Sequence, residues 1–261
     1  MAAPIPLGRI DWYENLTTDL DGAIAFYAQL LGWTITIWGE GPDPYRMWTN
    51  RGTSLGGVLQ LPDAARNMGA PPHWMMYVTV PDVDASVEQA RSLGATAYVA
   101  PTDIAQVGRF AVLVDPEDAP FAVIRPERLR PQRQGRPRVG EFSWHELAAK
   151  DQVKAFEFYH ALFAWEKDES HDMGPLGTYQ LLRRKGAKRP MGGIFTKPKD
   201  MPAAAWQLYI RVKDLDAEVA KLAWLRGRVV QPPMEVPGGD RIAQCVDSCG
   251  AHFALHWMKT E

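Results

Sequence analysis

The sequence predicts an α+β protein made of two tandem copies of one module, with each copy consisting of two βαβββ units. Two patterns lead to this prediction: a long internal repeat, and a strand–helix order that occurs twice within each copy. The composition agrees with it, because 46% of the 261 residues are hydrophobic and 23% are charged. That is ordinary usage for a globular protein and supplies enough apolar side chains for two hydrophobic cores.

The repeat is visible in the opening segment of each copy. Residues 8–33, GRIDWYENLTTDLDGAIAFYAQLLGW, align with residues 140–165, GEFSWHELAAKDQVKAFEFYHALFAW, at a displacement of 140 minus 8, or 132 residues. The same displacement relates Trp74 to Trp206, Tyr77 to Tyr209, Asp82 to Asp214, Arg109 to Arg241 and Asp115 to Asp247. Only the middle slips, by four residues at the Gly-Gly pair, as expected of a loop that differs in length.

This repeat divides the chain into a first module, residues 1–131, and a second module, residues 132–261. The segment between the copies, residues 127–139, is rich in arginine and proline and has no apolar periodicity. We interpret it as an extended, solvated linker, with an anion-binding strip as the alternative.

The first unit of each copy opens with a strand and a helix. Residues 12–18 and 144–150 alternate in hydrophobicity like half-buried strands, and Asp19 and Asp151 follow as helix N-caps. The first helix then carries apolar residues at helical spacing, namely Ile24, Phe26, Tyr27, Leu30 and Leu31. A turn at Gly32 leads into three further apolar stretches that end near Leu61, which completes one βαβββ unit.

The second unit repeats this order. Residues 73–95, HWMMYVTVPDVDASVEQARSLGA, read as a strand, an Asp cap, a helix and a glycine stop. Three more strands are predicted near residues 95–101, 109–114 and 120–125. Four βαβββ units therefore make up the chain.

Charge and cysteine content narrow the range of partners. The net charge is −2 and the pI is near 6.3, so no global field would attract nucleic acid or an anionic membrane. Cys245 and Cys249 lie four residues apart without the second pair that a four-thiolate zinc site needs. Few cysteines, no signal-like start and no long apolar run favour a cytoplasmic protein. We expect a small-molecule partner, and a monomer by intrachain module pairing or a homodimer.

Several motifs resemble the vicinal-oxygen-chelate superfamily, which includes glyoxalase I, bleomycin-resistance proteins and extradiol dioxygenases. They are the helix motif Ala-x-x-Phe-Tyr followed by Leu-Gly-Trp or Phe-Ala-Trp, the second-helix segments DVDASVEQARSLGA and DLDAEVAKLAWLRGR, and the closing segment DPEDAPFAVIRP. The resemblance covers most of both copies. Its nearest form is the tandem two-module subgroup typified by a mycobacterial secreted antigen.

The resemblance implies that two βαβββ units curl into a cup-shaped mixed sheet with the ligand inside. Metal-using members carry His, Gln or Glu seven residues before the Asp cap of each half, and Glu seven residues after the Asp of the final turn. The six corresponding positions here hold Trp12, Met75, Ala122, Trp144, Gln207 and Ala254. Only Gln207 offers a suitable donor, and a metal site needs about three protein ligands. We therefore expect neither a metal nor another cofactor.

The last strand invites an alternative metal site, because His252 and His256 share a face with Ala254. They stand four residues apart, which is ~13 Å along an extended strand, too far to bind one ion together. Either could still join Gln207 or Glu146 from a neighbouring strand. The simpler interpretation is that both line a hydrated cup.

Strand alternation assigns the candidate site. Trp12 and Glu14 face into the first cup, and Trp144 and Glu146 face into the second. The tryptophans could stack on a planar ligand, while the glutamates accept hydrogen bonds or act as a catalytic base. The other candidate ligand-binding residues are Tyr45, Met75, Tyr77, Arg109, Tyr179, Gln207, Tyr209, Arg241, His252 and His256. In the alternative interpretation each glutamate pairs with an arginine or tyrosine and stabilises the fold.

Three functions are compatible with this pattern, and whether the protein is an enzyme stays open. The leading hypothesis is a small-molecule binder without the usual metal ligands, whose ligand lies in aromatic cups. The second is a metal-independent or atypically liganded lyase, isomerase or hydroxylase-like enzyme that uses Glu14 or Glu146 as base. The third is an interaction protein with vestigial cups.

Overall fold

The structure, a computed structural model, describes residues 4–40, 44–131 and 135–259. The first repeat contains β1 (Arg9–Thr17), α1 (Leu20–Leu31), β2 (Thr34–Trp38), β3 (Tyr45–Asn50), β4 (Thr53–Gln60), α2 (Asp63–Asn67), β5 (His73–Thr79), α3 (Val83–Ser92), β6 (Thr96–Ile104), β7 (Gly108–Val114) and β8 (Pro120–Pro126). The second contains β9 (Phe142–Ala149), α4 (Gln152–Phe163), β10 (Trp165–Asp172), the 3-10 helix η1 (Gly174–Leu176), β11 (Thr178–Arg184), β12 (Gly192–Thr196), β13 (Ala205–Val212), α5 (Leu215–Leu222), β14 (Arg228–Glu235), β15 (Arg241–Val246) and β16 (His252–Trp257).

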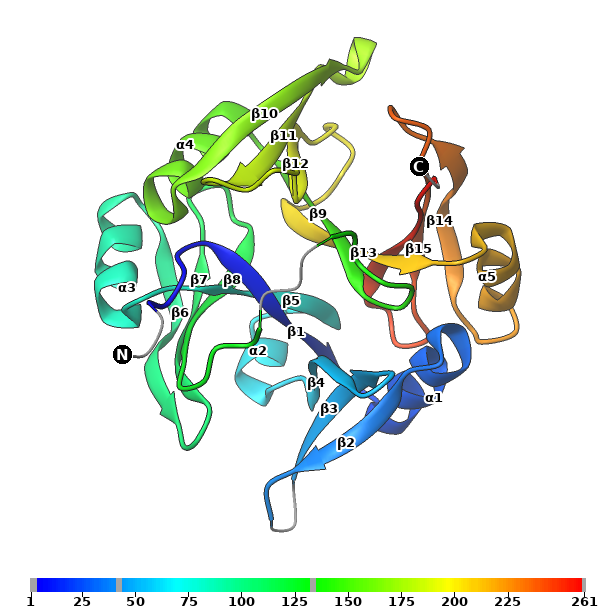
Figure 1. The fold of residues 1–261 in the computed structure, drawn as a ribbon, viewed down its shortest axis with the longest axis horizontal. Helices are drawn as coiled ribbons and strands as arrows, with labels where there is room; N and C mark the ends of the chain where they lie inside the picture. Colours follow the sequence, from blue (N-terminus) through cyan, green and yellow to red (C-terminus); the bar gives the residue numbers. More distant parts are fainter. Residues whose placement is uncertain (1–3, 41–43, 132–134, 260–261) are drawn as a thin grey trace. The chain divides into compact units, whose positions relative to one another are not determined.

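Each repeat forms one eight-stranded mixed sheet (Figure 1), with the order β2-β3-β4-β1-β5-β8-β7-β6 in the first and β10-β11-β12-β9-β13-β16-β15-β14 in the second. This order confirms the predicted α+β class and the four βαβββ units. The short α2 and η1 were not predicted.

Aspartate caps begin all four long helices of the βαβββ units, as the sequence predicts. The carboxylates of Asp19, Asp82 and Asp214 each accept a hydrogen bond from the backbone N–H three residues on. Asp151 accepts from both Val153 and Lys154. Each cap satisfies N–H groups that the first helical turn leaves without a partner.

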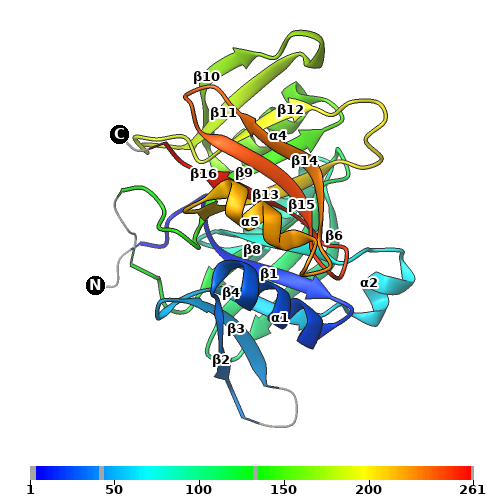
Figure 2. The same cartoon turned by 90° about the vertical axis from the view of Figure 1, so that its right-hand side faces the viewer.

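The chain packs into two compact units. Unit 1 comprises Met1–Asp11, Met76–Gln134 and Trp144–Trp206, and unit 2 comprises Trp12–Met75, Gly135–Ser143 and Gln207–Glu261. Each unit contains the first half of one repeat and the second half of the other. Helix α3 lies beside α4 in unit 1 (Figure 1), and α1 lies beside α5 in unit 2 (Figure 2). The module boundary after residue 131 stays a prediction, and residues 132–134 lie outside the described chain.

In each unit a buried tyrosine forms hydrogen bonds with an aspartate and a tryptophan, and we call each such set a latch. In unit 2, Tyr27 on α1 donates to Asp247 at 2.9 Å and accepts from Trp74 Nε1 at 2.7 Å. In unit 1, Tyr159 on α4 donates to Asp115 at 2.8 Å and accepts from Trp206 Nε1 at 3.0 Å. The first helix of one repeat is thereby fixed to the last turn of the other repeat.

Trp33 and Trp165 lie in the two cores, as the sequence predicts. They are only 1% and 0% exposed. Trp33 Nε1 donates to the Gly140 carbonyl and Trp165 Nε1 to the Gly8 carbonyl, both at 2.8 Å. A buried indole N–H thus has a partner, which removes the cost of burying it.

Within the described ranges, no helix has the length and apolar character needed to cross a membrane.

Candidate functional site

Unit 2 contains a chain of hydrogen bonds formed by Trp12, Tyr45 and Glu14. Trp12 and Glu14 lie two positions apart on β1 and share one face of the sheet, while Tyr45 begins β3. Trp12 Nε1 donates to Tyr45 Oη at 3.0 Å, and Tyr45 Oη donates to Glu14 Oε1 at 2.7 Å. The indole and phenol rings stack with their centroids 6.3 Å apart. We call this set the first triad.

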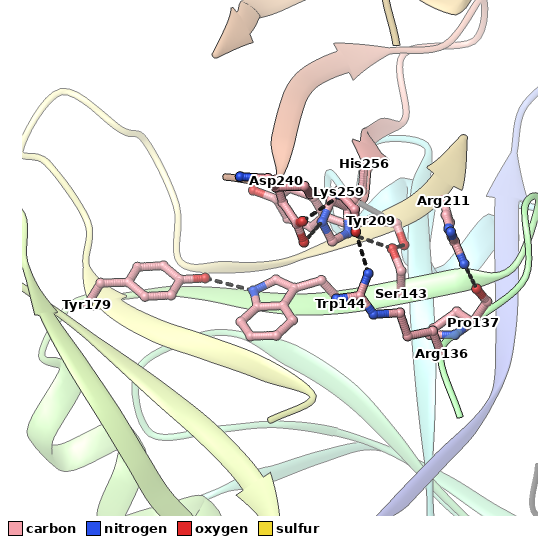
Figure 3. Close-up of polar contacts among 10 residues, drawn as sticks. All are labelled: Arg136, Pro137, Ser143, Trp144, Tyr179, Tyr209, Arg211, Asp240, His256 and Lys259. Carbon is pink, nitrogen blue, oxygen red and sulfur yellow. Dashed lines mark hydrogen bonds and ion pairs between the residues drawn. The ribbon is translucent and has the colours of Figure 1, made fainter. Parts of the chain in front are cut away.

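Unit 1 contains the same arrangement, the second triad, formed by Trp144, Tyr179 and Glu146. Trp144 Nε1 donates to Tyr179 Oη at 2.9 Å, as Figure 3 shows. Tyr179 Oη in turn donates to Glu146 Oε2 at 2.8 Å. Each repeat therefore forms the same type of triad. The sequence predicts this correspondence, in which Trp144, Glu146 and Tyr179 match Trp12, Glu14 and Tyr45.

Glycines beneath the tyrosine rings make both triads possible. A Cβ atom at Gly57 would lie 2.0 Å from Tyr45 Oη, and one at Gly193 would lie 2.2 Å from Tyr179 Cε1. The preceding glycines, Gly56 and Gly192, lie against the backbone of the adjacent parallel strand, where a Cβ would lie 1.7 and 2.0 Å from a carbonyl oxygen. The Gly-Gly pair was visible in the repeat, but its role as the floor of the site was not predicted.

The Tyr179 hydroxyl stays protonated, and both tyrosine hydroxyls donate a hydrogen bond to the glutamate of their triad. Burial, and then the negative charge of Glu146, raise the pKa of Tyr179 well above its ordinary value. Glu14 is only 8% exposed, and a buried carboxylate is costly unless a donor offsets its lost hydration. The Tyr45 hydroxyl is such a donor. The indole N–H groups are directed at the tyrosines, and Trp12 and Trp144 remain half-buried.

Met75, Tyr77, Gln207 and Tyr209 lie on the second-half strands, as predicted. Met75, Tyr77 and Tyr209 are buried, at 6%, 6% and 3% exposure. Gln207 is half-buried, and its Nε2 has no hydrogen-bond partner among the described residues.

Arg109 and Arg241 form ion pairs outside the triads. Arg109 Nε and Nη2 contact the Asp84 carboxylate at 2.7 and 2.8 Å. Arg241 Nη1 and Nη2 contact Asp216 at 2.8 and 3.0 Å. Each aspartate lies in the first turn of a helix, so each arginine joins a strand to a helix N-terminus. These contacts do not join either arginine to a glutamate of a triad. Ligand binding by Arg109 and Arg241 stays a prediction.

The two histidines of β16 have different surroundings. His252 is exposed, whereas His256 is 5% exposed. His256 contacts Ser143 and Asp240, neither of which was a predicted site residue. These contacts of His256 do not include Gln207 or Glu146, the residues that the alternative metal site would need.

The residues at the family's metal positions do not fit a metal ion. The indole nitrogens of Trp12 and Trp144 donate to tyrosines, and an indole N–H has no lone pair to coordinate a metal. Ala122 and Ala254 are fully buried and carry no donor. The described residues also contain no group of three His, Cys, Asp or Glu side chains that could hold a metal ion. We assign no chemical step to a metal.

Comparison with known proteins shows what the chain is similar to. Residues 11–124 match the family model for a glyoxalase-like domain. The chain is 29% identical over 256 residues to "Putative glyoxylase CFP32" of Mycobacterium tuberculosis, covering 95% of this chain and 94% of that protein. It is 28% identical over 272 residues to the anthracycline biosynthesis protein DauV of a Streptomyces species, covering 95% of this chain and 92% of that protein.

A solved structure shows the same fold. The Mn(II)-bound glyoxalase from Novosphingobium aromaticivorans aligns with a TM-score of 0.66 and 13% sequence identity, over 97% of this chain and 83% of that one. The repeat and the strand order of both sheets show two tandem modules with the vicinal-oxygen-chelate fold, and the match of residues 11–124 to a glyoxalase-like domain supports that superfamily.

Proposed function

We propose that this protein binds a planar small molecule at its Trp–Tyr–Glu triads, without the metal that many superfamily members use. The observation that carries the proposal is the duplication of the triad. Two segments with little identity outside their motifs build the same hydrogen-bonded indole, phenol and carboxylate over the same glycine floor.

The geometry of the triad favours a flat ligand with at least one hydrogen-bond donor. The indole N–H is already used within the triad, so a ligand would meet the indole mainly through its ring face. A carboxylate offers about four acceptor sites, so the hydrogen bond from tyrosine does not by itself prevent the glutamate from accepting one from a ligand. The ligand's donor would therefore bind the glutamate while its ring stacks on the tryptophan.

The relatives support an aromatic ligand. The similarity to an anthracycline biosynthesis protein extends over nearly the whole chain, and anthracyclines are planar polycyclic molecules with phenolic hydroxyl groups. We propose polycyclic phenols as the ligand class. We also place the protein in the cytoplasm, for which two cysteines without a disulfide are support.

Binding of hydroxylated anthraquinone, followed by tryptophan fluorescence quenching, tests this function. We expect saturable quenching, and affinity that falls at least about tenfold in each of Trp12→Ala and Trp144→Ala for the site concerned. Trp224→Ala is the matched control, because Trp224 is 89% exposed and belongs to neither triad. Equal affinity in all three variants would remove the stacking proposal.

An enzyme that uses Glu14 or Glu146 as base is the second candidate. The specific observation in its favour is the short hydrogen bond from tyrosine to each glutamate, since that phenol could also stabilise an oxyanion that develops on the substrate. Retained ligand affinity with lost turnover in Glu14→Gln and Glu146→Gln would support catalysis. Loss of affinity alone would support the binder.

A further inference from the structure

We propose that Ser143, His256 and Asp240 form a nucleophilic site that accepts acyl groups from small activated esters. All three residues belong to unit 2, and none is a member of a triad. The inference is independent of the proposed function.

Ser143, His256 and Asp240 are joined in series by hydrogen bonds. Ser143 Oγ lies 2.9 Å from His256 Nδ1, and His256 Nε2 lies 3.0 Å from Asp240 Oδ2, as Figure 3 shows. Asp240 Oδ1 accepts a hydrogen bond from the Lys259 backbone N–H at 2.8 Å. A hydroxyl, an imidazole and an oriented carboxylate in this order are the parts of a serine nucleophile with its general base. The two imidazole nitrogens are exchanged relative to the usual serine triad, but either nitrogen can act as the base.

The contact with Asp240 selects the tautomer of His256. Asp240 can only accept a hydrogen bond when ionised, so the neutral imidazole carries its proton on Nε2. The Nδ1 lone pair then faces Ser143 Oγ at 2.9 Å, the shorter of the two contacts to which this hydroxyl can direct its proton. The Tyr209 carbonyl, 3.2 Å from the hydroxyl, is the competing acceptor.

The surroundings of His256 favour the neutral form of its imidazole. Burial is the main cause that lowers the pKa of His256, and the positive charges of Arg211 and Arg136 lower it further, against the effect of Asp240. The imidazole is therefore neutral and able to accept a proton at pH 7.

The first repeat has different residues at the positions of Ser143, Asp240 and His256. At a displacement of 132 residues, Ser143, Asp240 and His256 correspond to Asp11, Gly108 and Ile124. The first repeat thus lacks the serine and the imidazole at this place, and Asp11 is instead paired with Arg9. The constellation belongs to the second repeat alone and is not a requirement of the fold.

The reaction balances without any further co-reactant except water. Ser143 Oγ attacks the ester carbonyl carbon, its proton passes to His256 Nδ1, and the bond between the carbonyl carbon and the leaving oxygen breaks. The imidazolium then returns the proton to the leaving alkoxide or phenolate. Water, deprotonated by His256, attacks the acyl carbon of the acyl-serine. The bond from that carbon to Ser143 Oγ breaks, the imidazolium returns its proton to Oγ, and the carboxylic acid is released. Because Ser143 is only partly exposed, short acyl groups are favoured.

Treatment of the full-length protein with p-nitrophenyl acetate tests the site. We expect a burst of p-nitrophenol, the mass increase of one acetyl group, and peptide mapping that locates the acetyl group on Ser143. The burst rate should increase with pH through a pKa below the ordinary value of histidine. Ser143→Ala should abolish the burst, and Asp240→Asn and His256→Gln should slow it by about 100-fold or more.

Ser170→Ala is the matched control, because Ser170 is exposed and remote in sequence, and it should react like the unmodified protein. Circular dichroism of each variant distinguishes lost chemistry from lost structure. The labelling of the unaltered protein decides the question even if His256→Gln does not fold. No burst, or acetylation confined to lysine or cysteine and unchanged in Ser143→Ala, would overturn the proposal.

Discussion

At the scale of single residues, the hydroxyls of Tyr45 and Tyr179 connect an indole to a carboxylate in each triad. Strand alternation could predict that Trp12 and Glu14 share a face, because side chains alternate strictly along a strand. It could also suggest the tyrosines as candidates. It could not predict that both hydrogen bonds of each triad converge on the phenol. In the first repeat, β1 and β3 are neither consecutive in the chain nor adjacent in the sheet, where β4 lies between them.

Substitution of the floor glycines should disrupt the triads. In Gly57→Ala the new methyl group would overlap Tyr45, so we expect the free energy of unfolding to fall by about 1 to 3 kcal/mol, as for other overpacked sites. Urea unfolding measures this. In a Tyr45→Ala background the same substitution should cost clearly less, and an equal cost in both backgrounds would show that the tyrosine ring is not the group displaced.

The imidazole of His145 should give the protein a pH-dependent stability. Burial lowers the pKa of His145 to about 4, while its ordinary value is 6.5. Because the pKa is lower in the folded state than in the unfolded state, folding favours the neutral imidazole. The folded state therefore has its full stability above pH 6.5 and loses stability as the pH falls towards 4. The shift corresponds to about 3 kcal/mol.

Urea titrations at pH 7 and pH 4 measure that difference. In His145→Asn, whose amide can still donate to the Met191 carbonyl that His145 contacts, the difference in unfolding free energy between the two pH values should shrink. A pH dependence unchanged by the substitution would contradict this assignment.

At the scale of helices and strands, local signals predicted most of what is observed. Asp19, Asp82, Asp151 and Asp214 each begin a helix because an aspartate side chain satisfies free N–H groups of the first turn. Helix α2 was not predicted, since Pro62 at its N-cap makes no side-chain hydrogen bond and the helix has five residues. Strand order alone did not show that Asp84 lies beside Arg109, and ligand binding by Arg109 stays a prediction.

Loss of the latch hydroxyls should destabilise the helices that carry them. In Tyr27→Phe the buried Trp74 N–H loses its acceptor and Asp247 loses a donor, and Tyr159→Phe has the same effect on Trp206 and Asp115. Each substitution should lower the free energy of unfolding by about 2 to 4 kcal/mol, because buried polar groups are left without partners.

Chemical denaturation compares these variants with Tyr98→Phe, the control, since Tyr98 is 58% exposed. The two latches belong to different units, so their effects should be additive in the double variant if unfolding is two-state. Latch variants as stable as the Tyr98→Phe control would show that these hydroxyls do not hold the helices.

At the scale of the whole molecule, the repeat predicted two equivalent sheets but not the composition of the compact units. The two copies are so alike in pattern that the sequence alone does not indicate which half packs with which. The latches identify which halves pack together. Tyr27 in the first repeat donates a hydrogen bond to Asp247 in the second, and Tyr159 in the second donates one to Asp115 in the first. Long-range pairing of this kind leaves no local signal.

Duplication of the triad also predicts the number of binding sites. If each triad holds one ligand, the unaltered chain has two sites, and each can be removed separately through its tryptophan. The sites need not have equal affinity, because their neighbouring residues differ, as Met75 and Gln207 illustrate.

Calorimetric titration with hydroxylated anthraquinone tests the central claim most directly. We predict a stoichiometry of two ligands per chain, one in either Trp12→Ala or Trp144→Ala, and none in the double variant, with no change in Trp224→Ala. A stoichiometry that stays the same when both tryptophans of the triads are removed would contradict the account.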